Sequence, residues 1–207
     1  MTQASHRQRM LTGQPYLDSD PELVAARRDC LGAVDRFNAL AGDDADGRAA
    51  ILTELFGGFG PESTVMAPLR CDYGFNVSMG RESFINYDGI LLDCARIVIG
   101  DYVNIGPRVQ LLTALHPMDD HRARREHWET AEPIIIGDGV WMGGGVIVCP
   151  GVSIGADSVI GAGSVVTRDI PPMSFAAGNP CRVIREITEQ DSMKYKPEIL
   201  ADNRVIE

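Results

Sequence analysis

One histidine stands where a polar segment interrupts an otherwise regular chain. His116 lies in the stretch Thr113-Ala114-Leu115-His116-Pro117, at the start of a charged, irregular region that spans residues 115–133. An imidazole is the side chain best suited to take a proton from a hydroxyl group near neutral pH. The same residue type also fits a surface histidine with only local hydrogen bonds, and spacing alone leaves both interpretations open. As a catalytic group, His116 would act as a general base on a hydroxyl.

Short polar side chains stand upstream of this histidine. Asp72, Asn86 and Asp93 are spaced through a region rich in small aliphatic residues and glycine. Taken singly, each is best explained as a residue of a tight turn, because Asp and Asn hydrogen-bond their own backbone and tolerate turn geometry. Taken together, the three side chains could line a groove near the base.

The elements that must position these groups follow from a six-residue repeat between Val98 and Val166. A small aliphatic residue recurs at this spacing, usually with glycine after it, and another small or branched residue follows four positions later. A period of six matches neither a helix nor a half-buried strand. It is typical of hexapeptide coils that stack into a parallel β-helix, in which each aliphatic side chain packs on its equivalent in the next coil. The aliphatic–glycine pairs are Ile99-Gly100, Ile105-Gly106, Ile136-Gly137, Met142-Gly143, Ile154-Gly155 and Ile160-Gly161.

The region before the repeat has helical character. Ser19-Asp20-Pro21-Glu22 predicts a helix start, with a capping residue followed by proline at the first helical position, and apolar residues then recur at helical spacing up to Ala41. A second helix is predicted from Arg48 to Phe56, and we expect the two to pack as a hairpin. The sequence therefore predicts a helical region over residues 1–60, a β-helix over 61–185 with the loop 115–133, and a tail over 186–207.

The amino-acid composition limits which binding partners and which cellular compartment we expect for the protein. The chain of 207 residues has a formal net charge of −10, which argues against nucleic acid or an anionic membrane as its main partner. No apolar run approaches the roughly 20 residues that span a bilayer, and residues 1–10 lack the apolar core of a signal peptide. The cysteines are five in number without a Cys-x-x-Cys pair, which favours reduced thiols, a cytoplasmic setting and no structural zinc.

A set of short motifs then follows in a fixed order. The motifs are Asp72-Tyr73-Gly74-Phe75-Asn76, Asn86-Tyr87-Asp88, Leu92-Asp93, His116-Pro117, and the segments 136–141, 160–167 and 178–184. This ordered set resembles the sugar O-acetyltransferases of the maltose, galactoside and nodulation type. The coil repeat alone marks only the wider hexapeptide-repeat superfamily, whereas the ordered set is more specific and covers nearly the whole chain. The helical N-terminal region is similar to that of the maltose acetyltransferases.

The resemblance implies a fold and a reaction. It implies a mainly β protein, a left-handed parallel β-helix assembled as a homotrimer, with active sites between neighbouring prisms and acetyl-CoA as the acetyl donor, without a metal. His116 matches the family's catalytic base, and Glu129 matches the residue that orients this base in maltose-type members, with Trp128 or Thr130 as the neighbour if the loop aligns one residue differently. Asn86 could also donate a hydrogen bond to the developing oxyanion. The positions that match the acceptor side are Asp18, Asp72, Asn86 and Asp93.

The resemblance also assigns the side that binds the cofactor. Trp141, Gly144 and Ala162 match positions along the pantetheine arm, and Gly144 stands where galactoside-type members have serine. Cations near the coenzyme A phosphates make physical sense in an acidic protein. Without the family, the arginines would be interpreted as a solvated surface. The positions that match the phosphate site are Thr167, Arg168, Arg182 and Arg185.

Four functions fit the sequence to different degrees. The first is transfer of an acetyl group from acetyl-CoA to a sugar hydroxyl, and the second is the same chemistry on a xenobiotic such as chloramphenicol, or on serine. The third is a γ-type carbonic anhydrase, since His116 and His121 have the spacing of two of its zinc ligands. A third ligand is needed upstream in the coils, yet only His6 precedes His116, which argues against zinc chemistry. The fourth is a non-catalytic trimeric scaffold.

Overall fold

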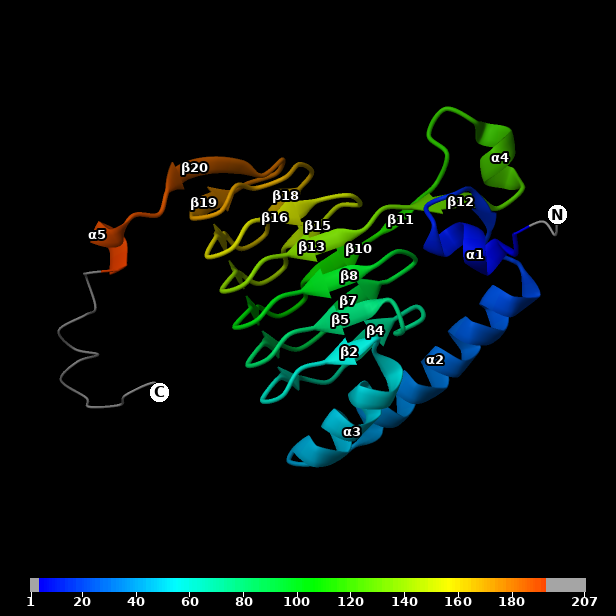
Figure 1. Ribbon diagram of the computed structural model, residues 1–207, viewed down its shortest axis with the longest axis horizontal. Coiled ribbons are helices and arrows are strands. Elements are labelled where there is room, and N and C mark those ends of the chain that lie inside the picture. The colour runs from blue at the N-terminus through cyan, green and yellow to red at the C-terminus, as the bar shows by residue number, and fades with distance from the viewer. Residues whose placement is uncertain (1–3, 193–207) are drawn as a thin grey trace.

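The protein is a stack of β-coils flanked by helices (Figure 1). The computed structural model describes residues 4–192, so most of the tail predicted at 186–207 lies outside the described residues. None of the helices between residues 4 and 192 combines the length and the apolar composition that a membrane-spanning helix needs. The predicted parallel β-helix, with its helical N-terminal region and its loop, is confirmed.

The coil has three walls, each a sheet of parallel strands from successive turns, except that the last strand of face II runs antiparallel. Face I consists of β2 (Gly58–Phe59), β5 (Val77–Met79), β8 (Ile97–Ile99), β13 (Ile134–Ile136) and β16 (Ser153–Ile154). Face II consists of β3 (Thr64–Val65), β6 (Phe84–Ile85), β9 (Asn104–Ile105), β14 (Trp141–Met142), β17 (Val159–Ile160), β19 (Ser174–Ala177) and β20 (Arg182–Glu186). Face III consists of β4 (Leu69–Cys71), β7 (Gly89–Leu92), β10 (Gln110–Leu112), β15 (Ile147–Val148) and β18 (Val165–Val166).

The repeated aliphatic residues form columns inside the coil. On face I the strand registers place Met79 beside Ile99, Ile99 beside Ile136 and Ile136 beside Ile154, and all four are buried. Strands in a sheet lie about 4.8 Å apart, so each side chain contacts its equivalents above and below. The six-residue period therefore reflects one wall strand per repeat, with the same inward positions in each coil.

The glycine after the aliphatic residue is required by the tight approach of successive coils. A Cβ on Gly100 would lie 2.3 Å from the Asp138 Oδ1 atom and 2.8 Å from its backbone nitrogen. No real side chain tolerates such contacts with backbone atoms. The glycines of the repeat thus keep the coils close enough for the wall strands to hydrogen-bond.

The N-terminal helices close one end of the coil. The side chain of Asp20 accepts a hydrogen bond from the Glu22 N–H and so starts the predicted first helix, whereas Asp44 caps the second helix three residues earlier than predicted. The side-chain amide of Asn38 both donates to the Leu69 carbonyl and accepts from the Leu69 N–H, which satisfies the edge of the first face III strand. The helices are α1 (His6–Leu11), α2 (Pro21–Ala39), α3 (Ala45–Leu55), α4 (His121–Arg125) and α5 (Glu189–Ser192).

The loop at residues 115–133 is only partly irregular. Two of its strands form a small antiparallel sheet with a strand from the N-terminal region, in the order β1 (Tyr16–Leu17), β12 (Trp128–Ala131) and β11 (Ala114–Leu115). This sheet and α4 project from the side of the coil stack where α1 lies (Figure 1). The excursion is therefore anchored to the helical region as well as to the coil.

Candidate active site

The small antiparallel sheet sets His116 beside a carboxylate. Leu115 pairs with Thr130 across β11 and β12, and the chain continues from Leu115 directly into His116. The Nδ1 atom of His116 lies 3.7 Å from Oε1 of Glu129, and their side chains are 63% and 12% exposed. This separation exceeds a hydrogen bond, but catalytic contacts are often longer before substrate binds. Trp128 instead packs against the ring of His6, at 5.9 Å between centroids.

Tyr16 holds that carboxylate by a hydrogen bond, and it was not among the site residues predicted from the sequence. The register of β1 and β12 places Tyr16 opposite Glu129, and the Tyr16 hydroxyl donates a 2.9 Å hydrogen bond to Oε2 of Glu129. Tyr16 is completely buried. Burial, and then the neighbouring Cys94 and Glu129, raise the pKa of Tyr16 far above its usual range, so the hydroxyl keeps its proton.

Asp18 places a carboxylate beside the same sheet. Its backbone N–H donates to the His127 carbonyl at 3.3 Å, while its Oδ1 atom is buried without a hydrogen-bond partner among the described residues and lies 3.9 Å from Nδ1 of His127. Arg27 of α2 reaches the same place, donating to the Asp18 carbonyl at 2.6 Å and to the Tyr73 hydroxyl at 3.1 Å. Arg27 was not among the site residues predicted from the sequence.

Asp93 is buried too deeply to bind the acetyl acceptor directly. Its side chain is fully buried, and its carboxylate accepts hydrogen bonds from the backbone N–H groups of Asp72, Tyr73 and Asn76 at 3.2, 2.8 and 3.2 Å. Direct contact between Asp93 and an acceptor does not fit this placement. Asp93 instead holds the 72–76 turn that forms part of the site's wall.

Asp72 is the carboxylate of this pair that stays partly open. Its Oδ2 atom accepts a weak hydrogen bond from the Cys94 thiol at 3.6 Å. Burial, and then the charge of Asp93, raise the pKa of Asp72. Asp72 and Asp18 thus supply carboxylate oxygens, which can accept hydrogen bonds, on the side of the coil that carries His116.

Asn86 lies at a different corner from His116 within one chain. Asn86 follows β6 and precedes β7, so it lies where face III begins, whereas His116 leaves the coil where face III ends. The turns of Gly106, Gly144 and Ala162 stack in the same corner as Asn86: a Cβ on Gly106 would lie 2.7 Å from the Gly144 nitrogen, and the turns of Gly144 and Ala162 are likewise in contact. The predicted oxyanion donor and the pantetheine positions are therefore neighbours, and both are separate from the base.

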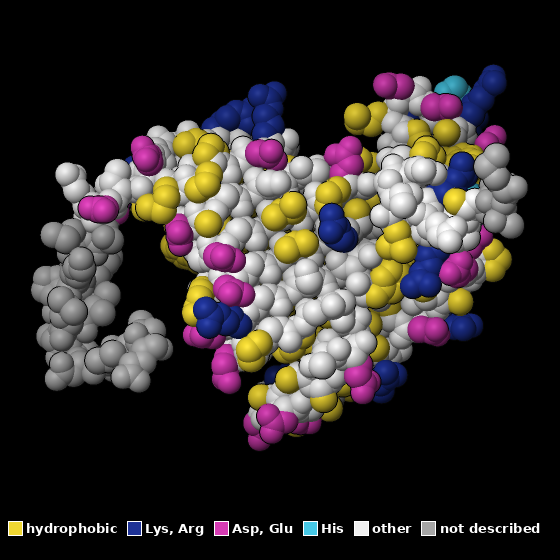
Figure 2. All heavy atoms as spheres, viewed as in Figure 1, with side chains coloured by type: hydrophobic (Ala, Val, Ile, Leu, Met, Phe, Trp, Pro, Cys, Tyr) yellow, Lys and Arg dark blue, Asp and Glu magenta, His cyan; other side chains and the backbone are white. Residues whose placement is uncertain are grey.

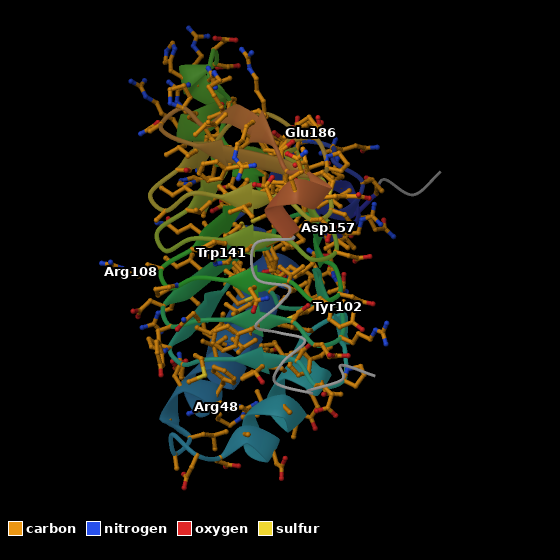
Figure 3. All side chains as sticks on the ribbon, turned by 90° about the vertical axis from the view of Figure 1, so that its left-hand side faces the viewer. Arg48, Tyr102, Arg108, Trp141, Asp157 and Glu186 are labelled. Carbon is orange, nitrogen blue, oxygen red and sulfur yellow. The ribbon has the colours of Figure 1, made fainter. Side chains whose placement is uncertain are left out.

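The remaining cofactor positions lie on face II and at the last coil. Trp141 projects from β14 on the side wall of the stack and is 55% exposed (Figure 3). The Cys181 N–H donates to the Val165 carbonyl, which ties the start of β20 to β18. Arginine side chains gather above this end of the coil (Figure 2). The predicted phosphate-binding residues at this end, all exposed, are Thr167, Arg168, Arg182 and Arg185.

The histidine pair with zinc-ligand spacing is split between two elements. His116 follows directly after β11, and His121 begins α4. Within residues 4–192, no three His, Cys, Asp or Glu side chains are grouped so that they could hold a metal ion.

Known proteins resemble this chain in both sequence and fold. Residues 9–60 match the maltose acetyltransferase hexapeptide capping motif, and residues 133–168 match the bacterial transferase hexapeptide repeat. Galactoside O-acetyltransferase of Escherichia coli is 38% identical over 91% of this chain and 92% of its own length.

Two solved structures extend the likeness to the fold. A maltose O-acetyltransferase from Clostridium difficile 630 is 46% identical with a TM-score of 0.88, over 90% of this chain and all of that one. A galactoside acetyltransferase in complex with coenzyme A is 37% identical with a TM-score of 0.87, over 92% and 94% of the two chains. The chain therefore belongs to the hexapeptide-repeat acetyltransferases of the maltose and galactoside type.

Proposed function

We propose that this enzyme transfers the acetyl group of acetyl-CoA to a hydroxyl of a sugar, with His116 as general base. The observation that carries the proposal is the pairing of exposed His116 with Glu129, whose side chain is only partly exposed. With its Nδ1 side turned to a carboxylate, the imidazole has Nε2 free to face a substrate. An oriented base of this kind takes up a proton and is stabilised as the imidazolium by the carboxylate behind it.

The reaction then follows two proton transfers. Nε2 of His116 removes the acceptor's hydroxyl proton as the oxygen attacks the thioester carbonyl. The tetrahedral intermediate collapses, the carbon–sulfur bond breaks, and the imidazolium returns the proton to the coenzyme A thiolate. Asn86 donates a hydrogen bond to the oxyanion of that intermediate, and a donor already in place lowers the barrier because it needs no reorganisation.

A sugar acceptor is favoured by the polar groups around the base. Carboxylates accept hydrogen bonds from hydroxyl groups, and those bonds are strengthened by the charge. Asp18 contributes a carboxylate whose Oδ1 atom makes no hydrogen bond among the described residues and lies 3.9 Å from Nδ1 of His127, and Asp72 offers a partly open carboxylate. Arg27 adds a donor beside Asp18. A sugar ring carries several hydroxyl groups, and it can hydrogen-bond both to the carboxylates of Asp18 and Asp72 and to the guanidinium of Arg27.

The separation of the two corners favours an active site shared between chains. Asn86 and Trp141 lie on parts of the coil that His116 of the same chain does not face, so a neighbouring copy is the natural source of these groups. We therefore propose a homotrimer in which acetyl-CoA lies between two prisms. The pantetheine arm follows Trp141, Gly144 and Ala162, and the phosphates face the residues Thr167, Arg168, Arg182 and Arg185. All five cysteines are free thiols, which supports a reducing, cytoplasmic setting.

An acceptor panel tests the proposed reaction. The protein is incubated with acetyl-CoA and, in turn, maltose, glucose, a methyl galactoside, chloramphenicol or serine, and the released thiol is measured. We expect thiol release above the acceptor-free rate with at least one sugar. Release with chloramphenicol or serine alone would show that the acceptor class is wrong. No release with any acceptor would contradict the proposed sugar transfer.

A further inference from the structure

We propose that Tyr16 is a positioning residue for the base: its buried hydroxyl fixes the Glu129 carboxylate, and the carboxylate in turn orients His116. This inference rests on the proposed function, in which His116 removes the acceptor's proton. It assigns part of the catalytic machinery to the N-terminal region, more than one hundred positions before Glu129 in the chain.

The pairing of two strands places the Tyr16 and Glu129 side chains next to each other. Tyr16 and Glu129 are register partners across β1 and β12, and the hydroxyl donates to Oε2 at 2.9 Å. The strand β1 is itself held on both sides. The Leu17 N–H donates to Nδ1 of His6 in α1, and the Asp18 N–H donates to the His127 carbonyl.

The two oxygens of Glu129 are thereby given different partners. Oε2 accepts the Tyr16 hydroxyl, and Oε1 is the atom that lies 3.7 Å from Nδ1 of His116. A carboxylate held in this way favours the tautomer with a proton on Nδ1 and a lone pair on Nε2, whereas a free imidazole favours the proton on Nε2. The raised pKa of Tyr16, caused by burial and then by Cys94 and Glu129, keeps the hydroxyl a donor.

Tyr16 also fills space in a small core. It packs with Met10, Leu23, Tyr73 and Cys94, and this packing needs the ring but not the hydroxyl. Phenylalanine at position 16 keeps the ring and removes only the donor. The Tyr16→Phe variant therefore distinguishes a role of the hydroxyl in positioning His116 from a role of the ring in packing.

The test measures the tautomer of His116 by nitrogen NMR in the full-length protein without substrate. The imidazole nitrogens are labelled, and the His116 signals are identified by their loss in His116→Ala. We expect the Nδ1-protonated form to predominate in the unaltered protein. In Tyr16→Phe we expect the population to shift towards the Nε2-protonated form, as in Glu129→Gln.

A matched control removes a different buried hydroxyl. Ser83 is buried in the coil, where its hydroxyl donates to the Gly100 carbonyl and accepts from the Val103 N–H, so Ser83→Ala also loses buried hydrogen bonds. We expect Ser83→Ala to lower the unfolding temperature and leave the His116 tautomer unchanged. An unchanged tautomer in Tyr16→Phe, or an equal shift in Ser83→Ala, would overturn the proposal. So would a predominance of Nε2-protonated His116 in the unaltered protein.

Steady-state kinetics provide a second measurement, made with a sugar of the acceptor panel that the enzyme acetylates. We expect Tyr16→Phe to lower kcat about tenfold, the effect of losing one hydrogen bond to a charged group, with the KM for acetyl-CoA unchanged. Combined with Glu129→Gln, the Tyr16→Phe change should add little further loss, because both act through one contact. Fully additive losses would overturn the proposal. The NMR result decides the positioning role even if no sugar is acetylated, so the two proposals fail separately.

Discussion

Replacing His116 with alanine lowers kcat for acetyl transfer by about 10²- to 10⁴-fold, the usual contribution of a positioned proton acceptor. The affinity for coenzyme A stays the same, because the imidazole acts on the acceptor's hydroxyl and the predicted coenzyme positions lie at another corner of the coil. Thiol release measures the first quantity, and calorimetric titration with coenzyme A measures the second. The loss falls on kcat because the proton transfer occurs only in the transition state.

A second histidine provides the control for this variant. His121 is exposed at the start of α4 and is also a loop histidine, so His121→Ala should leave kcat within about twofold, as expected of a surface change away from the reacting atoms. Turnover that persists in His116→Ala would show that another group is the base. An equal loss in both variants would show that the loop, rather than the His116 imidazole, is being disturbed.

Replacing Asp93 with alanine destabilises the fold by about 3 kcal/mol or more, because each buried donor left without a partner costs about 1–3 kcal/mol. Three backbone N–H groups, those of Asp72, Tyr73 and Asn76, lose their acceptor in this variant. The free energy of unfolding from denaturant titration measures the effect. All variants must be compared at one protein concentration, since association of chains contributes to apparent stability.

An exposed aspartate is the matched control for Asp93. The side chain of Asp29 is 76% exposed and contacts only the adjacent Arg28 among the ion pairs of residues 4–192, so Asp29→Ala should change the free energy of unfolding by about 0.5 kcal/mol or less. If Asp93→Ala were as mild as Asp29→Ala while abolishing turnover, Asp93 would be a binding residue rather than a support of the 72–76 turn.

The architecture was predictable because each coil repeats the chemistry of the one before. An inward aliphatic residue recurs at every sixth position, usually with a glycine after it, and a column such as Ile99 on Ile136 admits few other side chains. The helix start at Asp20 was predictable for a similar reason, since capping depends on residues a few positions apart.

Contacts between distant segments were not predictable in this way. The pairing of Tyr16 with Glu129 joins residues that no local pattern relates, and only the sheet of β1, β12 and β11 brings them together. Burial also separates residues of one type: Asp72 stays partly open while Asp93 is enclosed by backbone donors. The corner that holds Asn86 differs from that of His116, and this follows only from the order of the three walls.

The most direct test of the central claim is a crystal structure of the assembled protein with bound coenzyme A. A base that serves the thioester must have reacting atoms close to it, since near-attack distances are about 3–3.5 Å. We predict that the coenzyme's sulfur lies within about 5 Å of Nε2 of His116, one bond length or so beyond that contact range, with Trp141 of a neighbouring copy along the pantetheine arm. A sulfur more than about 10 Å from the imidazole, too far for transfer even through one water, would contradict the account.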